Sequence, residues 1–253
     1  MTNKLKYFVG NWKMFGNFAS LKIINQINSF SVKFDRSGKK NKIILCVPNT
    51  LVNYFAIKFK SKNVIIGAQN CHHNKDYGAF TGSVNAKMLK NSGAKYVILG
   101  HSENRLEGDT NYIIRKKIDS AIKHNLNIIF CIGESLNDKK KGKTLSVLKK
   151  QMNDSLNKNF NSKKILIAYE PVWSIGTGKI PKTTELKKIF KFMKNYLKKS
   201  LNKKTLPFVL YGGSVNDKNI GMFSSLRDID GFLIGSASQS SKKFIDIIKN
   251  YYK

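Results

Sequence analysis

The sequence predicts an α/β protein built as a closed (β/α)8 barrel, and two patterns along the chain support this prediction. Short apolar runs occur eight times, and segments with apolar residues at helical spacing lie between them. Runs that are apolar at nearly every position are typical of strands buried on both faces of a parallel sheet. Eight strands alternating with helices in about 250 residues favour a closed barrel over an open doubly wound sheet. The runs are residues 7–9, 43–47, 64–66, 96–99, 128–132, 165–168, 208–211 and 232–234.

Helical spacing is clearest after the first and the sixth runs. Leu21, Ile24 and Ile27 follow the first run, and apolar residues follow the sixth at positions 186, 189, 190, 193 and 197. This spacing places apolar side chains on the one face of a helix that packs on a core. The Lys-rich stretch 139–150 indicates a solvated loop and helix face.

Length and composition indicate a single domain, residues 1–253. The chain has 253 residues, 41% of them hydrophobic, and no Pro/Gly/Ser-rich linker divides it. A (β/α)8 barrel commonly has this size. The N-terminal apolar stretch Tyr7–Val9 is too short for a signal peptide or a membrane span. We therefore expect a soluble, cytoplasmic protein with no membrane partner.

The cysteines favour the same compartment. Cys46, Cys71 and Cys131 are widely spaced and odd in number, which argues against a disulfide framework and fits a reducing environment. Cys71, His72 and His73 form only a weak metal motif, because adjacent residues on an extended chain point in opposite directions and no second ligand cluster accompanies them. We expect no metal site there.

The chain is strongly basic. Its formal net charge is +31 and its isoelectric point is near 10, values that raise the prospect of a nucleic-acid or anionic-membrane partner. Arg is the preferred bidentate reader of phosphate and guanine, yet it occurs only at positions 36, 105, 115 and 227. Lys is spread along the whole chain, so the charge indicates a general compositional bias of the sequence and not a dedicated binding surface. A positive field would still raise the encounter rate with small anionic substrates.

Polar or Gly residues follow the apolar runs repeatedly. Because a barrel carries its catalytic groups at the carboxyl ends of the strands, these residues are expected to converge in space although they are scattered in the sequence. They are Asn11, Lys13, Gln69, Asn70, His101, Glu103, Gly133, Glu134, Glu170, Gly212, Gly213, Ser214, Gly235 and Ser236.

The most informative of these residues is Glu170. It follows the sixth run and precedes a loop that contains Pro171, Trp173, Gly176 and Gly178. A group at the carboxyl end of a barrel strand points into the ligand crevice, and the following loop can close over it. Glu170 is therefore a candidate base under a lid. The alternative is that Glu170 only caps the next element and that the Pro and Gly residues after it are those of an ordinary loop.

Two small-residue turns are candidate phosphate sites. Gly212, Gly213 and Ser214 follow the seventh run, and Gly235 and Ser236 follow the eighth. Backbone N–H groups at these two turns commonly bind phosphate in barrels, and a large side chain would hold the anion away from them. The alternative is a pair of ordinary βα turns. A nucleotide-binding P-loop ending at residues 142–144 is excluded because Asn137 stands where such a loop needs Gly.

Lys13 and His101 complement a carboxylate base. Lys13 would neutralise a phosphate or a developing enediolate, although a lone Lys is usually a surface charge. His101 follows Leu99 and Gly100, and a helix that begins there would disfavour the imidazolium and keep the ring neutral. A carboxylate base with a neutral electrophilic His suits proton abstraction beside a carbonyl, as in aldose–ketose isomerisation.

With these residues in place, the sequence resembles the triosephosphate isomerase family from Phe8 to Ile248. The resemblance implies a single-domain TIM barrel that interconverts dihydroxyacetone phosphate and D-glyceraldehyde 3-phosphate in glycolysis and gluconeogenesis, with no metal and no organic cofactor. The motifs that carry it are VGNWKM at 9–14, GAQN at 67–70, LGHSE at 99–103, CIGE at 131–134, AYEPVWSIGTGK at 168–179, YGGSV at 211–215 and DGFLIG at 230–235.

The resemblance also implies a role for each site residue, and a neutral His and lid closure are known features of this family. Glu170 moves a proton between C1 and C2, while His101 polarises the carbonyl and moves protons between the oxygens. Lys13 and Asn11 stabilise the developing negative charge. The supporting residues are Glu103, Ser102 and Cys131, and the phosphate-binding donors come from Gly176, Gly213, Ser214, Gly235 and Ser236.

The loop after Glu170 is then the lid. An enediolate phosphate that is exposed to water and free to rotate can eliminate its phosphate, and closure of the lid would prevent this. The lid consists of Pro171, Val172, Trp173, Ser174, Ile175, Gly176, Thr177, Gly178 and Lys179.

Two residues depart from the family pattern within the site. Ser174 replaces the usual Ala of the lid, and Ser236 replaces the second Gly that is usual after the eighth strand. Ser236 can still offer its backbone N–H, provided that its φ is negative.

The family forms homodimers by inserting the loop after the third strand into a pocket beside the partner's active site. Residues 71–84 form this loop here, with Phe80 and Thr81 at its tip. Ser83 stands where Glu is usual and Asn104 where Arg is usual, so an acidic and a basic partner are missing together. Loss of both charges leaves no uncompensated charge, and we still expect a dimer.

Three other interpretations compete with an isomerase. A different (β/α)8 enzyme acting on a phosphorylated metabolite would share the phosphate turns but would not need Glu170 with His101 and Lys13. A nucleic-acid-binding protein would explain the charge but not the lid. A noncatalytic relative would be expected to lack at least one catalytic residue, and all are present.

Overall fold

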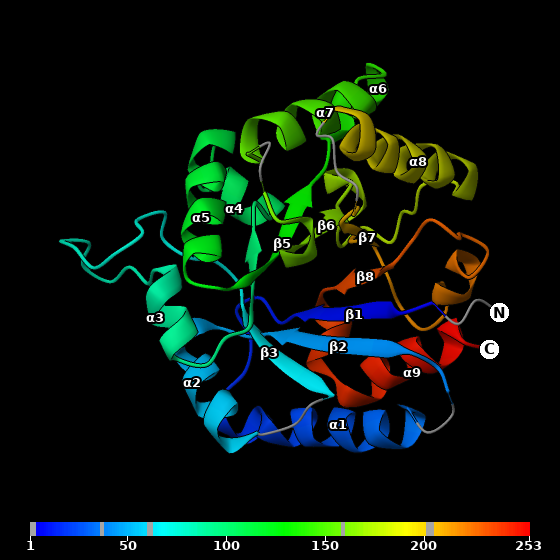
Figure 1. Cartoon of the computed structure of the whole chain (residues 1–253). Helices are drawn as coiled ribbons and strands as arrows, with labels where there is room; N and C mark the ends of the chain where they lie inside the picture. The colour runs from blue at the N-terminus through cyan, green and yellow to red at the C-terminus, as the bar shows by residue number, and fades with distance from the viewer. Residues whose placement is uncertain (1–3, 36–37, 60–62, 158–159, 201–204) are drawn as a thin grey trace.

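A computed structural model describes residues 4–35, 38–59, 63–157, 160–200 and 205–253. Eight parallel strands follow one another around a closed barrel, and β1 pairs with β8 to complete it (Figure 1). The predicted fold class is therefore confirmed. The strands are β1 (Lys6–Asn11), β2 (Asn41–Cys46), β3 (Val64–Ala68), β4 (Tyr96–Leu99), β5 (Asn127–Ile132), β6 (Ile165–Tyr169), β7 (Phe208–Tyr211) and β8 (Gly231–Ile234).

Helices surround the barrel and connect its strands. The two helical patterns in the sequence correspond to α1 and α8, and the apolar residues of both patterns face the core, Leu21 only partly buried. The helices are α1 (Leu21–Asp35), α2 (Asn49–Lys58), α3 (Ala86–Asn91), α4 (Ser102–Leu106), α5 (Asn111–Lys123), α6 (Leu136–Lys140), α7 (Thr144–Ser155), α8 (Thr183–Ser200) and α9 (Ser241–Tyr251). Short 3-10 turns are η1 (Phe18–Ser20), η2 (Ser162–Lys164), η3 (Val172–Ser174), η4 (Ile220–Phe223) and η5 (Ser236–Gln239).

The strands are buried on both faces, which explains why they are apolar at nearly every position. In β2, Ile44 packs inside the barrel, whereas its neighbours Ile43 and Leu45 pack outward among the helices. Successive side chains of a strand point to opposite faces, so two layers of core need two sets of apolar residues. Each fully buried Ile or Phe contributes about 1.5–3 kcal/mol relative to exposure.

All strands point to the same end of the barrel. In Figure 1 the arrows of β1 and β2 run toward the left of the view, where the loop between β3 and α3 projects, and both termini lie on the right. Side chains at the strand ends therefore meet at the left-hand end. None of the helices in the described part of the chain is long and apolar enough to cross a membrane.

Candidate active site

The ends of five strands enclose one cavity, and all of the predicted catalytic and phosphate-binding residues line it. The cavity has a volume of about 150 Å³. A second hollow of about 280 Å³ shares three of its residues and extends to Gln69, Asn70 and Glu103. The predicted residues that line the first cavity are Asn11, Lys13, His101, Glu170, Gly176, Gly213, Ser214, Gly235 and Ser236.

Glu170 lies at the end of β6 with its carboxylate buried. Burial raises the pKa of this carboxyl above its ordinary value, and His101 together with hydrogen bonds from the Cys131 thiol and the Ser102 backbone N–H opposes the rise. Cys131 and Ser102, both predicted as supporting residues, thus contact the carboxylate directly. A carboxylate that holds a proton more readily than usual suits a general base.

Two glycines make room for Glu170. A Cβ atom at Gly212 would lie 2.7 Å from Cγ of Glu170, and a Cβ atom at Gly133 would lie 1.7 Å from its carbonyl oxygen. Both distances are far below a van der Waals contact, so a side chain at either position would displace the glutamate. Gly133 belongs to a motif of the sequence, but its steric role was not predicted.

His101 presents one nitrogen to Glu170 and uses the other to begin a helix. Its Nδ1 accepts the backbone N–H of Glu103 at 3.2 Å and caps α4. Since a neutral imidazole has one donor and one acceptor nitrogen, this bond assigns the proton to Nε2. Nε2 lies 3.4 Å from Oε1 of Glu170, so the ring is a neutral donor that faces the cavity.

Lys13 adopts a strained backbone conformation. Its φ is +55°, and among the described residues other than glycine only Asn125 shares a positive φ. The backbone N–H of Lys13 donates to Oδ1 of Asn11 at 3.1 Å, and Nζ lies 2.6 Å from Oε1 of Glu103. Strain of this kind persists where the surrounding structure fixes it, commonly at functional sites.

The start of the lid is anchored to the end of β5. The indole N–H of Trp173 donates to Oε1 of Glu134 at 2.8 Å, and the Tyr169 hydroxyl lies 3.2 Å from both oxygens of the same carboxylate. Nζ of Lys139 lies 3.7 Å from the centre of the Trp173 ring. Lys139 therefore differs from the solvated face expected for 139–150, because the indole covers its ammonium. Sequence reasoning assigned no role to Glu134 or Lys139.

The tip of the lid is a compact turn. Gly176 and Gly178 have φ values of +70° and +74°, in the left-handed region that favours glycine. The Thr177 hydroxyl donates within the lid to the carbonyl oxygens of Trp173 and Ser174. Gly176 lines the cavity, so the lid contributes to the wall that Glu170 faces.

The two small-residue turns both line the cavity. Gly213 and Ser214 follow β7, and Gly235 and Ser236 follow β8. Ser236 begins η5 and is not among the residues with positive φ. The condition under which Ser236 can replace glycine is therefore met.

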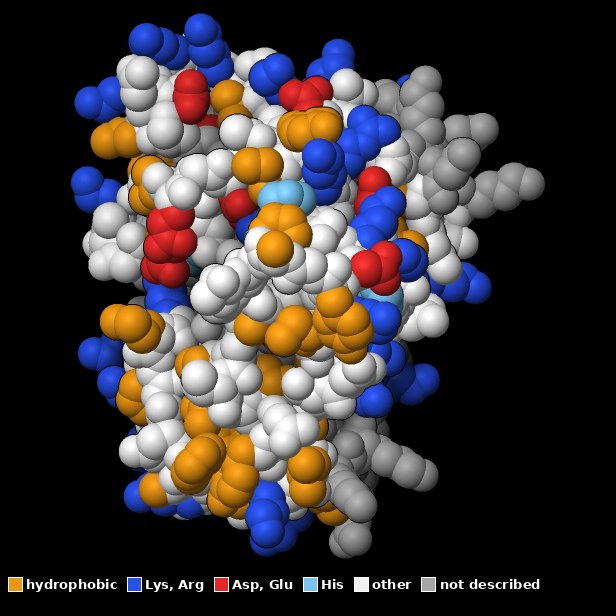
Figure 2. Space-filling model, turned by 90° about the vertical axis from the view of Figure 1, so that its left-hand side faces the viewer, with side chains coloured by type: hydrophobic (Ala, Val, Ile, Leu, Met, Phe, Trp, Pro, Cys, Tyr) orange, Lys and Arg blue, Asp and Glu red, His pale blue; other side chains and the backbone are white. Residues whose placement is uncertain are grey.

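The loop of residues 71–84 projects from the same end of the barrel. Residues 75–83 are all exposed, and the Phe80 ring, 45% exposed, rests on His72 with 4.4 Å between ring centroids. Hydrophobic side chains gather over the centre and lower part of this face (Figure 2). Exposed Met14 and Phe18 of the first βα connection belong to the same end.

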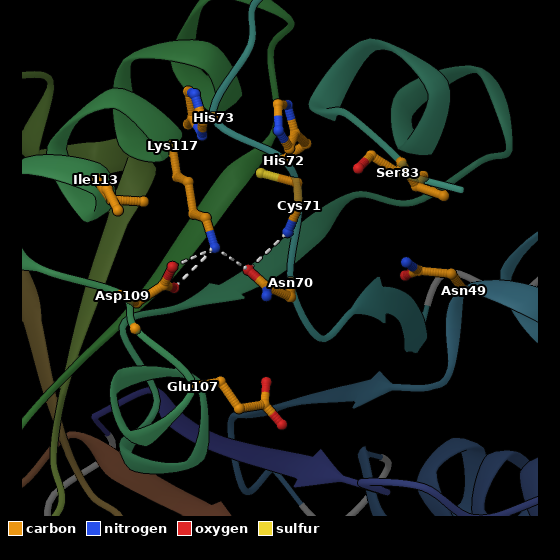
Figure 3. A pocket seen from close by; sticks show the side chains of 12 residues that line it. Asn49, Asn70, Cys71, His72, His73, Ser83, Glu107, Asp109, Ile113 and Lys117 are labelled. Carbon is orange, nitrogen blue, oxygen red and sulfur yellow. Dashed lines mark hydrogen bonds and ion pairs between the residues drawn. The ribbon is translucent and has the colours of Figure 1, made fainter. Parts of the chain in front are cut away.

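A pocket of about 370 Å³ lies between this loop and the loop that precedes α5. Figure 3 shows Lys117 extending toward Asp109 and Asn70, and its Nζ lies 2.7 Å and 3.0 Å from oxygens of these side chains. Ser83 lines the pocket, whereas Asn104 lines the hollow beside the active cavity. Within the described residues, no group of three or more His, Cys, Asp or Glu is arranged to hold a metal ion.

The fold and the cavity are those of a barrel enzyme of the aldose–ketose isomerase class, because a buried carboxylate faces a histidine at the carboxyl ends of the strands. The family model "Triosephosphate isomerase" matches residues 6–251, and the chain belongs to this family. It is an isomerase of glycolysis that interconverts dihydroxyacetone phosphate and D-glyceraldehyde 3-phosphate.

Curated relatives and a solved structure agree with this assignment. Triosephosphate isomerase of Buchnera aphidicola from Schizaphis graminum is 43% identical over 97% of each chain. The enzyme of Zygosaccharomyces bailii is 39% identical, over 96% of this chain and 98% of its own. The crystal structure of triosephosphate isomerase from Bartonella henselae, 33% identical, superposes with a TM-score of 0.87 and covers 98% of this chain and 99% of its own. The family resemblance of the motifs is confirmed.

Proposed function

We propose that Glu170 is the base of the isomerisation and His101 its electrophile. Glu170 takes a proton from C1 of dihydroxyacetone phosphate, and the electrons of that C–H bond move to form the enediolate. The Nε2–H of His101 donates to the carbonyl oxygen and then transfers protons between the two oxygens. Glu170 returns its proton to C2, which completes the conversion to glyceraldehyde 3-phosphate. Proton transfers of this kind contribute about 10²–10⁴-fold each.

The observation that carries this proposal is the 3.4 Å separation of His101 Nε2 and Glu170 Oε1 beside the cavity. A substrate that enters this space can contact the base and the donor together. Lys13 and Asn11 line the same cavity, where a cation and an amide would stabilise the negative charge of the enediolate. Glu103 holds the Lys13 ammonium in place through their ion pair.

The test is the coupled isomerase assay on the wild type and Glu170→Asp. Aspartate is shorter by one methylene group, so its carboxylate is withdrawn from the substrate by roughly 1 Å. We expect kcat to fall by about 10²-fold or more with KM little changed, because misplacement of this size costs about that much. A Glu170→Asp enzyme with wild-type kcat would contradict the proposal.

We propose that the two small-residue turns bind the substrate phosphate. Gly213, Ser214, Gly235 and Ser236 supply backbone N–H groups at the cavity that Glu170 also lines, and Gly176 adds one from the lid. Oriented amides of this kind bind anions without a formal charge. Inorganic phosphate is expected to inhibit competitively, and its failure to compete with substrate would contradict this assignment.

We propose a homodimer in which the 71–84 loop of each copy enters the pocket of the other. The exposed tip with Phe80, the pocket beside it and the apolar face around both support this arrangement. A twofold axis satisfies both contacts at once, since each copy offers a loop and a pocket. The pocket shares Asn49 and Asn70 with the hollow next to the active cavity, so an inserted loop would support the active site.

Light scattering across a dilution series tests the dimer, with Phe80→Asp as the disrupting variant. Tyr112→Asp is the matched control, because Tyr112 is also an exposed aromatic but lies on α5 outside the loop. We expect Phe80→Asp to dissociate at concentrations where the wild type and Tyr112→Asp are dimers. A fully active monomeric wild type would overturn the proposal.

We also infer a cytoplasmic location and no specific nucleic-acid partner. The three cysteines are free and buried, as suits a reducing compartment. The positive charge consists mainly of dispersed Lys, and base-specific readout usually depends on Arg. Cell fractionation tests the location. Enrichment of particular DNA or RNA sequences in a binding selection at physiological salt would contradict the absence of a specific nucleic-acid partner.

A further inference from the structure

Ser174 is a lid residue with no exposed surface, although loop side chains usually face solvent. Its Oγ has three polar neighbours: the carbonyl oxygen of Lys179 at 2.5 Å, the hydroxyl of Tyr211 at 3.2 Å and the backbone nitrogen of Ser214 at 3.3 Å. These neighbours belong to the far end of the lid, the end of β7 and the phosphate turn. One hydroxyl therefore joins three segments.

The direction of each hydrogen bond follows from the chemistry of the groups. A serine hydroxyl has one proton and two lone pairs. The Lys179 carbonyl can only accept, so it receives the Ser174 proton. The Ser214 N–H can only donate, and the Tyr211 hydroxyl must then donate as well. The hydrogen-bonding capacity of Ser174 is fully used.

Gly213 allows these groups to meet. A Cβ atom at Gly213 would lie 2.2 Å from the Tyr211 hydroxyl and 2.8 Å from Oγ of Ser174. Any side chain at this position would separate the lid from β7. The family usually carries Ala at position 174, which has no hydroxyl, so the connection is a feature of this chain.

We propose that Ser174 is a positioning residue whose hydroxyl competes with the substrate phosphate for the N–H of Ser214. This inference rests on the phosphate-binding role proposed above for the turn. When a phosphate oxygen takes the Ser214 N–H, Ser174 loses one of the two hydrogen bonds that it accepts. The arrival of phosphate thereby detaches the start of the lid from the phosphate turn and allows it to move over the substrate.

The test compares inorganic phosphate binding to the wild type, Ser174→Ala and Tyr211→Phe, by competitive inhibition and by titration calorimetry. Ser174→Ala removes the competitor, and we expect its dissociation constant for phosphate to be about 2- to 10-fold lower, the range that corresponds to one neutral hydrogen bond. Tyr211→Phe removes a lid-to-β7 bond but leaves the competitor, so its phosphate affinity is not expected to rise.

The possible results distinguish a failure of the proposed competition from a failure of the phosphate-binding role of the turn. Unchanged or weaker phosphate binding by Ser174→Ala would overturn the competition. Equal tightening in both variants would attribute the effect to a loosened lid and would also overturn it. A wild type that binds no phosphate would instead overturn the phosphate-binding role of the turn, and calorimetry detects this without reference to turnover. Alanine is the usual residue of the family, so Ser174→Ala is expected to fold, which thermal melting checks.

Discussion

The imidazole of His101 lies against the carboxylate of Glu170, with Nε2 and Oε1 3.4 Å apart and both side chains nearly excluded from solvent. The backbone N–H of Glu103 occupies the other ring nitrogen. The pair thus combines a carboxylate whose pKa is raised by burial with a ring fixed as a neutral donor. Its charge state has consequences for stability as well as for catalysis.

Replacement of Glu170 by Gln is expected to stabilise the fold at neutral pH. The folded-state pKa of Glu170 lies above its unfolded value because of burial, so the folded chain holds this proton more tightly and stability falls as pH rises between the two values. The loss of stability caused by ionised Glu170 is complete above the folded pKa and absent below the unfolded pKa of about 4.3. Thermal melting should show a higher Tm for Glu170→Gln at pH 7.

The pH dependence is the control for this prediction. The difference in Tm between Glu170→Gln and the wild type should shrink as the pH falls toward the unfolded pKa, because the wild-type carboxyl is then neutral in both states. A difference that stays constant with pH would show that packing, not ionisation, is responsible. Activity should meanwhile be lost in the variant, since an amide cannot accept the C1 proton.

Lys13 is expected to lower the stability of the fold through its backbone strain while its ammonium group supports activity. A residue at φ +55° other than glycine is strained by about 1–2 kcal/mol, and the extra freedom of glycine in the unfolded chain offsets part of this. Lys13→Gly should therefore gain up to about 1 kcal/mol, or about 2–4 °C in Tm, relative to Lys13→Met. Both variants lose the ammonium group and should lose about 10²–10³-fold in kcat/KM.

Lys13→Met is the matched variant because it lacks the ion pair with Glu103 but keeps a side chain in the left-handed conformation. The comparison therefore isolates the backbone strain. If Lys13→Gly melts at or below the temperature of Lys13→Met, the strain at this residue does not limit stability.

Much of the site followed from the sequence because it depends on strand ends alone. Apolar runs locate the strands, the barrel brings their carboxyl ends together, and Asn11, His101 and Glu170 then have to meet. The expectation that a helix begins at His101 and keeps its ring neutral followed from the polarity of a helix terminus, whereas the hydrogen bond from Glu103 N–H to Nδ1 was seen only in the structure. These inferences need only the order of elements, which hydrophobic periodicity supplies.

The contacts that hold the lid did not follow from the sequence. Glu134 binds Trp173, and Ser174 binds Tyr211, across 39 and 37 residues of sequence. Whether these side chains meet depends on their rotamers and, for Ser174 and Tyr211, on the space left by Gly213. Neither leaves a periodic pattern in the sequence. Lys139 was likewise grouped with surface lysines because its contact with the Trp173 ring depends on tertiary packing.

The basic surface is expected to accelerate capture of the anionic substrate. With a formal charge of +31, the field extends about 30 Å at 0.01 M ionic strength but only about 8 Å at 0.15 M. We expect kcat/KM for glyceraldehyde 3-phosphate to fall by up to about tenfold over this range while kcat changes little. Unphosphorylated glyceraldehyde is the control substrate, and equal salt dependence for both would rule out steering.

Deletion of residues 175–178, the tip of the lid, is expected to divert the reaction to methylglyoxal and inorganic phosphate. In the enediolate, electrons can move to break the bond between C3 and the phosphate oxygen, so that phosphate leaves with the electron pair and the remaining enol becomes methylglyoxal. The lid restrains the phosphate in the plane of the enediolate and excludes water, which slows this elimination. Gly176 lines the cavity, so the deletion removes that wall and leaves Glu170 in place. The measurement is the ratio of methylglyoxal to isomerised product, with Thr177→Ser as a control that keeps the lid length and its hydroxyl. The deletion should raise this ratio well above that of the wild type and the control, and an unchanged ratio would show that the lid does not protect the intermediate.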